Sequence, residues 1–216
     1  MSGAPHLTVT LRARRYLEAL SWDGTARLTS VATDVLGASR RSFASIYVAR
    51  TIVGAVARAF VPGCTLGGML VLCGAQGGGK SRFLAALAGG ELFGTYSAGR
   101  GVRAFQDAWI VEVPALEDEL STDRRGIFKA SLVAQSDAPG LDDPLHQRRS
   151  RPSVAIGSSN APSFWIEEPT RRFWPVQVGA IDVERMVATR DQVFAEAVTA
   201  YRNGDRWWLD AQAGAA

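Results

Sequence analysis

The sequence predicts an α/β fold in which helices cover both faces of a mainly parallel sheet. Three observations indicate this fold. A short apolar run over 69–73 leads directly into a glycine-rich loop. An amphipathic segment follows the loop, so strand, loop and helix come in that order. Further apolar runs then alternate with helical patterns, which is typical of parallel strands joined by helices.

The first part of the chain, residues 1–62, is expected to form an N-terminal helical segment. Apolar residues recur at helical spacing up to a turn at 22–24. A longer apolar stripe predicts a helix over 42–60, which Pro62 and Gly63 would end.

The central part, residues 63–180, contains the predicted sheet, and the last part, 181–216, is expected to be a C-terminal helical segment. Apolar runs rich in Val, Ile, Leu and Trp indicate buried strands, and the longer amphipathic stretches indicate helices. The expected strands are 69–73, 109–113, 154–157 and 173–176, and the expected helices are 80–87, 124–134 and 182–202.

Composition narrows the class of protein. The 216 residues are 47% hydrophobic and 21% charged, which is ordinary for a globular domain. No run approaches the ~18 apolar residues of a membrane helix, and the N-terminus has no secretory signal pattern. The two cysteines, Cys64 and Cys73, are expected to be buried free thiols in a reducing compartment. We therefore expect a cytoplasmic protein without a membrane partner; the net charge of +3 permits a nucleic-acid partner.

The glycine-rich loop has the spacing G-x-x-x-x-G-K-S of a P-loop, set by Gly74, Gly79, Lys80 and Ser81. Glycines let backbone N–H groups surround phosphate oxygens, and the helix that follows adds its positive N-terminal end. Lys80 is expected to reach the terminal phosphates, and the Ser81 hydroxyl to bind Mg²⁺. The sequence thus predicts ATP and Mg²⁺ as ligands of a contiguous loop: Gly74, Gln76, Gly77, Gly78, Gly79, Lys80, Ser81 and Arg82.

A P-loop enzyme also needs carboxylates at the end of a neighbouring strand. Glu112 lies within an apolar run, where an acidic side chain is costly unless it has a partner, so we expect it to hold the metal. Glu117, Asp118 and Glu119 follow as an acidic cluster, which on its own is typical of a solvated turn or a helix start.

Taken together, the motifs resemble the helicase-like domain of virulence-associated protein E, a family of phages and mobile islands. The resemblance spans most of the chain, and its motifs are specific in this order. They are Trp22-Asp23-Gly24 with Arg27, Pro62-Gly63, Gln76 to Ser81, Trp109 to Glu112, Ser159-Asn160, Arg171 to Val176, Ala195-Glu196-Ala197, Tyr201-Arg202, Gly204 and Trp207-Trp208-Leu209.

This resemblance implies an AAA+-like core and a homo-oligomeric ring, with a hexamer expected. It also implies single-stranded DNA as a partner, a primase, fused or separate, and a location in a bacterial or phage-infected cell. Asn160 is then the expected sensor of the γ-phosphate or the attacking water. Arg171 and Arg172 are expected to include an arginine finger that acts on a neighbouring subunit's nucleotide. Arg148, Arg149 and Arg151 form the densest basic run, which is typical either of a phosphate contact in a ring pore or of a solvated loop.

Two positions depart from the family pattern. Where the family has a second glutamate, the expected water-polarising residue, this chain has Ala115. The copy is then hydrolysis-impaired by nature, or Glu117 substitutes from a shifted position, or the residue was changed to trap bound ATP. We favour the last explanation because every neighbouring position still matches. The stretch before Arg151 also lacks the family's Arg-Pro-Pro-Tyr, which brings its substrate contacts into question.

The sequence therefore predicts a P-loop ATPase that acts as a ring-forming, helicase-type motor on DNA in a phage or mobile-element replication protein. The alternative is an ATP-dependent assembly switch without translocation, serving phage interference or a partner replicase. A small-molecule kinase would explain the loop but not the paired arginines.

Overall fold

The computed structural model describes residues 5–97, 99–120, 125–132, 134–137, 148–161 and 172–209. The sequence alternates short apolar runs with amphipathic stretches, and the structure turns these into strands and helices. The strands are β1 (Met69–Cys73), β2 (Phe93–Thr95), β3 (Ile110–Val113), β4 (Ser136–Asp137), β5 (Arg149–Ser150), β6 (Val154–Ser159) and β7 (Phe173–Gln177). The helices are α1 (Pro5–Glu18), α2 (Val31–Asp34), α3 (Ala44–Phe60), α4 (Lys80–Ala88), α5 (Ala104–Asp107), α6 (Leu116–Leu120), α7 (Arg125–Leu132) and α9 (Val183–Arg202), with short 3₁₀ turns at Leu28–Ser30 and Gly101–Arg103.

Five strands form one parallel sheet in the spatial order β2-β3-β6-β1-β7, while β4 and β5 pair as a separate antiparallel ribbon. The strand that leads into the glycine-rich loop, β1, is flanked by β6 and β7. Its register places Leu72 beside Ser158 of β6 and beside Val176 of β7. The expected α/β fold with a parallel sheet is confirmed.

The two faces of the sheet bury different residues of each strand, because successive side chains of a strand point to opposite faces. On β1, Leu70 and Leu72 pack into one apolar cluster, and Met69, Val71 and Cys73 pack into the other. All five are buried, which explains why the strand reads as a continuous apolar run.

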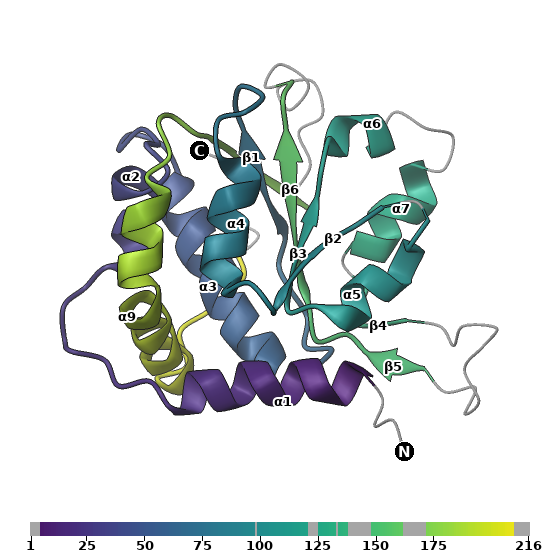
Figure 1. The fold of residues 1–216 in the computed structure, drawn as a ribbon, viewed down its shortest axis with the longest axis horizontal. Coiled ribbons are helices and arrows are strands. Elements are labelled where there is room, and N and C mark those ends of the chain that lie inside the picture. The colour runs from purple at the N-terminus through teal and green to yellow at the C-terminus, as the bar shows by residue number, and fades with distance from the viewer. Residues whose placement is uncertain are drawn as a thin grey trace.

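Helices α1, α3, α4 and α9 cover one face of the sheet, and α5, α6 and α7 cover the other (Figure 1). Trp109, just before β3, fills the first interface. Its indole Nε1 donates a hydrogen bond to the carbonyl of Ala55 on α3 at 2.9 Å, and its ring lies 4.9 Å from that of Phe194 on α9. The partner for the indole N–H allows a fully buried Trp.

The three segments expected from the sequence contribute to one core. Val9 and Leu17 from α1, Val56 from α3 and Phe194 from α9 all belong to the cluster that packs on the sheet. The terminal helices α1, α3 and α9 therefore pack on the same face of the sheet as α4.

No helix in the described part of the chain has the length and apolarity to cross a membrane.

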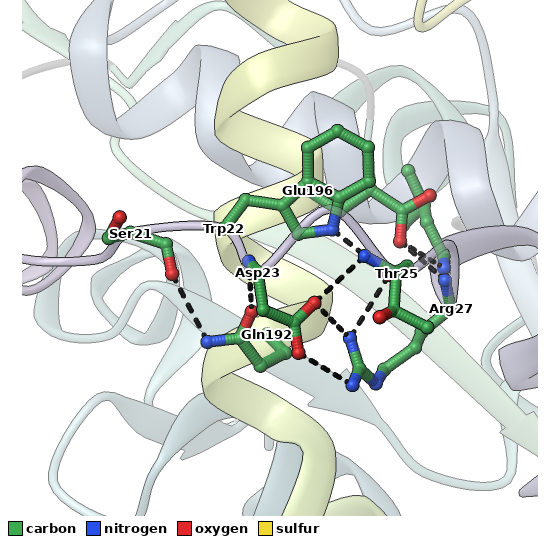
Figure 2. Close-up of polar contacts among 8 residues, drawn as sticks. Ser21, Trp22, Asp23, Thr25, Arg27, Gln192 and Glu196 are labelled. Carbon is green, nitrogen blue, oxygen red and sulfur yellow. Dashed lines mark hydrogen bonds and ion pairs between the residues drawn. The ribbon is translucent and has the colours of Figure 1, made fainter.

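The Trp22-Asp23-Gly24 signature joins the loop after α1 to helix α9 (Figure 2). Asp23 and Arg27 form a two-pronged ion pair, with N···O distances of 2.7 and 2.8 Å. The Asp23 backbone N–H donates to Gln192, and the Arg27 backbone N–H donates to Glu196, both on α9. These motifs therefore act as structural ties between distant parts of the chain.

A buried polar cluster lies near the amino end of β6. Arg151 is 2% exposed, pairs with Asp137 and stacks 4.3 Å above the Phe105 ring. Arg58 donates to the backbone carbonyls of Arg151 and Ala134. Both predictions for Arg151, a phosphate contact in a ring pore and a solvated loop, are therefore wrong, because its guanidinium is enclosed in the core.

Helix and strand boundaries agree with the prediction to within a few residues, but several short elements were not predicted. The three-residue β2, the five-residue α6 and the β4–β5 ribbon are among them. Cys73 is buried as expected, whereas Cys64 is only half-buried.

Candidate functional site at the carboxyl edge of the sheet

The glycine-rich loop leaves β1 and turns into α4 at one edge of the sheet. Gly79 caps α4 with a φ of 89°, a left-handed backbone conformation that favours glycine. Gly74 is enclosed, since a Cβ there would lie 2.7 Å from Cγ2 of Val178. Residues 75–78 between them are exposed. The loop is thus fixed at both ends and presents its middle, with Gln76, to solvent.

Lys80, the first residue of α4, turns back toward this loop. It is only 7% exposed. Its Nζ donates hydrogen bonds to the carbonyls of Gly74 and Ala75 at 2.8 and 2.9 Å, and to Oδ1 of Asn160 at 2.9 Å. A buried ammonium needs such oxygen partners, and the three bonds hold the charge between the ends of β1 and β6.

Ser81 and Glu112 meet on the other side of the same edge. The Ser81 Oγ donates to Oε1 of Glu112 at 2.7 Å, and the Oγ of Ser158 donates to the same oxygen, also at 2.7 Å. Glu112 is 2% exposed. Hydroxyl groups from α4 and β6 therefore both donate to one carboxylate oxygen carried by β3.

Glu117 reaches the site from the first turn of α6. Its Oε1 accepts a hydrogen bond from the backbone N–H of Asn160 at 3.0 Å. Burial, and next the charge of Glu117, raise the pKa of the Cys73 thiol to about 12. The thiol beneath the site therefore stays protonated at neutral pH, and the carboxylates are the acidic groups available there.

The donor set suits a hard divalent cation. A carboxylate and a hydroxyl are the oxygen ligands that Mg²⁺ takes in phosphate-binding sites, where phosphate and water oxygens complete the shell. Within the described residues, no group of three or more His, Cys, Asp or Glu side chains could hold a metal ion by itself. The pair Ser81 and Glu112 fits an ion that arrives with a phosphate ligand.

The predicted arginines do not join this cluster in one chain. Arg171 lies outside the described residues. Arg172 is exposed and precedes β7, at the amino end of a strand whose five residues span roughly 16 Å. Because β7 is parallel to β1, Arg172 lies at the opposite edge of the sheet from the loop. Arg82 is exposed on α4, next to Ser81.

Sequence reasoning did not assign a role to Ser158. It lies in a buried strand, two residues before the polar Asn160, and its small side chain gives no sign of a partner. The one available signal was polarity, since β6 ends in Ser158 and Ser159 after an apolar start and the polar Asn160 follows it.

The fold and the site define an α/β protein in which a glycine-rich loop, a lysine and carboxylates meet at the carboxyl edge of a parallel sheet. The virulence-associated protein E-like domain matches residues 17–216. The chain belongs to this family, as its motifs predicted.

Two solved structures share the fold at low sequence identity. The A form apo structure of the NrS-1 C-terminal region, residues 305–718, has a TM-score of 0.53 and 12% identity over 83% of this chain. A second A form apo structure of that region has a TM-score of 0.53 and 10% identity over 84% of this chain. The present chain spans 46% and 47% of those chains, somewhat less than half of their length. No curated protein matches the sequence.

Proposed function

We propose that the chain binds ATP with Mg²⁺ at the carboxyl edge of the sheet and hydrolyses it, as the motor domain of a phage or mobile-element replication protein. The convergence of Lys80, Ser81, Glu112 and Asn160 carries this proposal. The four residues come from three elements far apart in sequence, and each has the chemistry that a nucleotide phosphate site requires.

The position of the loop supports a phosphate site. Ligands of parallel α/β sheets bind outside the carboxyl ends of the strands. The loop follows a central strand and opens a nine-residue helix, whose N-terminal N–H groups favour an anion. An AAA+-like P-loop core accounts for the loop, the strand order and the polar end of β6 together.

Each residue has a role in this proposal. Lys80 would leave the Gly74 and Ala75 carbonyls and hold the β- and γ-phosphates. Ser81 and Glu112 would hold Mg²⁺, which supplies charge neutralisation on the phosphate oxygens when bound. Asn160 would orient the γ-phosphate or the water through its amide.

The ring and its DNA partner extend the proposal beyond one chain. Arg172 lies roughly a strand's length from its own loop, so an arginine finger at this position would serve a neighbouring subunit. Such a finger contributes about 10³-fold or more in rate. The proposed assembly is a homo-oligomeric ring, with a hexamer expected, that acts on single-stranded DNA beside a fused or separate primase.

The first experiment measures ATP binding and hydrolysis by the purified chain. A fluorescent ATP analogue should bind in the presence of Mg²⁺, and Lys80→Met should weaken binding at least tenfold. Arg202→Met, which removes an exposed cation at the end of α9, is the control and should bind as the parent does. Equal binding by the Lys80 and Arg202 variants would refute the phosphate site.

One observation favours a second candidate function, an ATP-dependent assembly switch. The position of the family's second glutamate is occupied by Ala115. Sedimentation velocity and single-stranded DNA titration separate the two functions. A motor should show DNA-stimulated hydrolysis and a steep salt dependence of DNA binding, whereas a switch should assemble with ATP and ignore DNA.

A further inference from the structure

We propose that Glu117 is the carboxylate that activates the attacking water in this chain, so that Ala115 reflects a shifted glutamate and not, as the sequence alone favours, a change made to trap ATP. The inference rests on the proposed ATP site and assigns the carboxylate that would accept a proton from the attacking water there. Glu117 Oε1 accepts from the Asn160 backbone N–H at 3.0 Å, and Asn160 Oδ1 accepts from Lys80 Nζ at 2.9 Å. One residue, Asn160, thus separates this carboxylate from the ammonium that would hold the phosphates.

The backbone after β3 explains how Glu117 reaches this position. Ala115 has a φ of 44°, a left-handed conformation that a residue with a side chain rarely adopts. This turn starts α6 directly after the strand, with Leu116 fully buried. Leu116 packs over Gly157 of β6, where a Cβ would lie 2.6 Å from its Cδ2. The absence of a side chain at Gly157 lets α6 approach β6 closely enough for Glu117 to contact Asn160.

The second oxygen of Glu117 has unused hydrogen-bonding capacity. Oε2 is buried and has no hydrogen-bond partner in the part of the chain that the structure describes. A buried carboxylate oxygen without a donor is unfavourable, because burial removes its hydrogen bonds to water without replacing them. A water molecule between Glu117 and the γ-phosphate would supply that donor.

The other nearby carboxylates are less suitable for this role. Glu112 already accepts from both Ser81 and Ser158 through Oε1, which directs it to the metal side of the site. Asp118 is exposed on α6, facing solvent. Glu117 is the acidic residue of α6 that contacts the end of β6.

The step assigned to Glu117 is a proton transfer. The water oxygen attacks the γ-phosphorus as the carboxylate accepts one water proton. The bond between the γ-phosphorus and the β–γ bridging oxygen breaks, and its electron pair leaves on the ADP β-phosphate. The protonated Glu117 then releases its proton to the phosphate product or to solvent, so ATP and water give ADP and phosphate.

The test compares Glu117→Gln with Glu119→Gln, a matched change two residues along the same helix. Glu117→Gln should bind the fluorescent ATP analogue with Mg²⁺ as tightly as the parent but lose hydrolysis about 100-fold or more. It should also weaken binding of ADP with aluminium fluoride, a transition-state mimic. Glu119→Gln should leave all three measurements within about twofold of the parent.

A measurement without nucleotide checks the contact itself. The backbone amide resonance of Asn160 in the ligand-free protein should shift upfield in Glu117→Gln and not in Glu119→Gln, since a neutral amide is a weaker acceptor than a carboxylate. Thermal unfolding confirms that both variants fold.

The outcomes separate this inference from the proposed function. If the parent chain binds no ATP, the ATP site fails and the inference fails with it. If the parent binds ATP without hydrolysing it, or if Glu117→Gln hydrolyses ATP as fast as the parent, the ATP site stands and Glu117 is not the activating residue. An unchanged Asn160 resonance would also overturn the inference.

Discussion

Glu196 on α9 accepts a hydrogen bond from the backbone N–H of Arg27 at 2.6 Å, across 169 residues of sequence. The same carboxylate oxygen accepts from the N–H of Leu28 at 2.8 Å, at the start of a 3₁₀ turn whose first residues have no side-chain cap of their own. A side chain from the far end of the chain thus supplies the cap that the local sequence lacks (Figure 2).

Removing this cap should destabilise the protein without altering the proposed nucleotide site. We expect Glu196→Ala to lower the free energy of unfolding by about 1–2 kcal/mol, because two backbone donors lose their acceptor. Urea unfolding measures the change. Glu184→Ala on the same helix removes an exposed carboxylate and should change stability by less than half as much. Equal effects would mean that the cap contributes nothing specific.

Acidification should weaken the ion pair between Asp23 and Arg27. The hydrogen bonds from Arg27, and next that from the Thr25 backbone, hold the pKa of the Asp23 carboxyl well below its usual range. A depressed pKa stabilises the fold above the unfolded pKa of about 3.9, and this contribution is lost as the pH falls from there toward the folded pKa. The midpoint temperature of thermal unfolding should therefore fall less steeply in Asp23→Asn than in the parent between about pH 5 and about pH 2, a range that brackets the unfolded pKa. Parallel curves would contradict the linkage.

The hydroxyl of Ser81 should determine how strongly nucleotide affinity depends on Mg²⁺. Ser81→Ala removes a ligand from the proposed ion and frees Oε1 of Glu112 from one of its two donors. We expect the gain in ATP affinity on adding Mg²⁺ to shrink by about tenfold, with affinity in the presence of EDTA unchanged. Calorimetric titrations with and without the metal measure this. Ser97→Ala, at an exposed serine after β2 whose backbone carbonyl accepts from the Arg100 and Gly101 N–H groups, is the control. An unchanged gain in Ser81→Ala would remove the hydroxyl from the metal shell.

The buried ion pair between Arg151 and Asp137 should matter for stability and not for DNA. Arg151→Met leaves Asp137 buried without its cation, which destabilises a fold by about 3–5 kcal/mol. Arg148→Met removes an exposed guanidinium from the same region and should change stability little. Denaturant unfolding gives both values. A stable Arg151→Met with weakened DNA binding would restore the nucleic-acid interpretation rejected above.

The sequence predicts the loop and the strands well because their signals are local. A continuous apolar run such as 69–73, followed by glycines and a lysine, identifies a buried strand and its loop with no knowledge of the neighbours. The same logic places Glu112 near the end of a strand, where the proposed metal would bind. Strand β2 cannot be predicted in this way, because its three residues, none fully buried, carry too little periodicity.

The contacts within the site cannot be read in this way. The bond from Asn160 to Glu117 joins residues 43 positions apart and depends on which strands lie side by side. Ser158 contacts Glu112 because β6 is inserted between β3 and β1, and strand order leaves no trace in the apolar pattern. The left-handed Ala115, which starts α6, is likewise a residue with no turn signal of its own.

The tie between Arg27 and Glu196 also bears on synthesis of the chain. At the usual 5–20 residues per second, a ribosome needs on the order of ten seconds or more to add the 169 residues that separate the two partners. During that interval the loop after α1 has neither Gln192 nor Glu196 to accept its N–H groups. That loop therefore gains its acceptors on α9 only after the five strands of the parallel sheet have been translated.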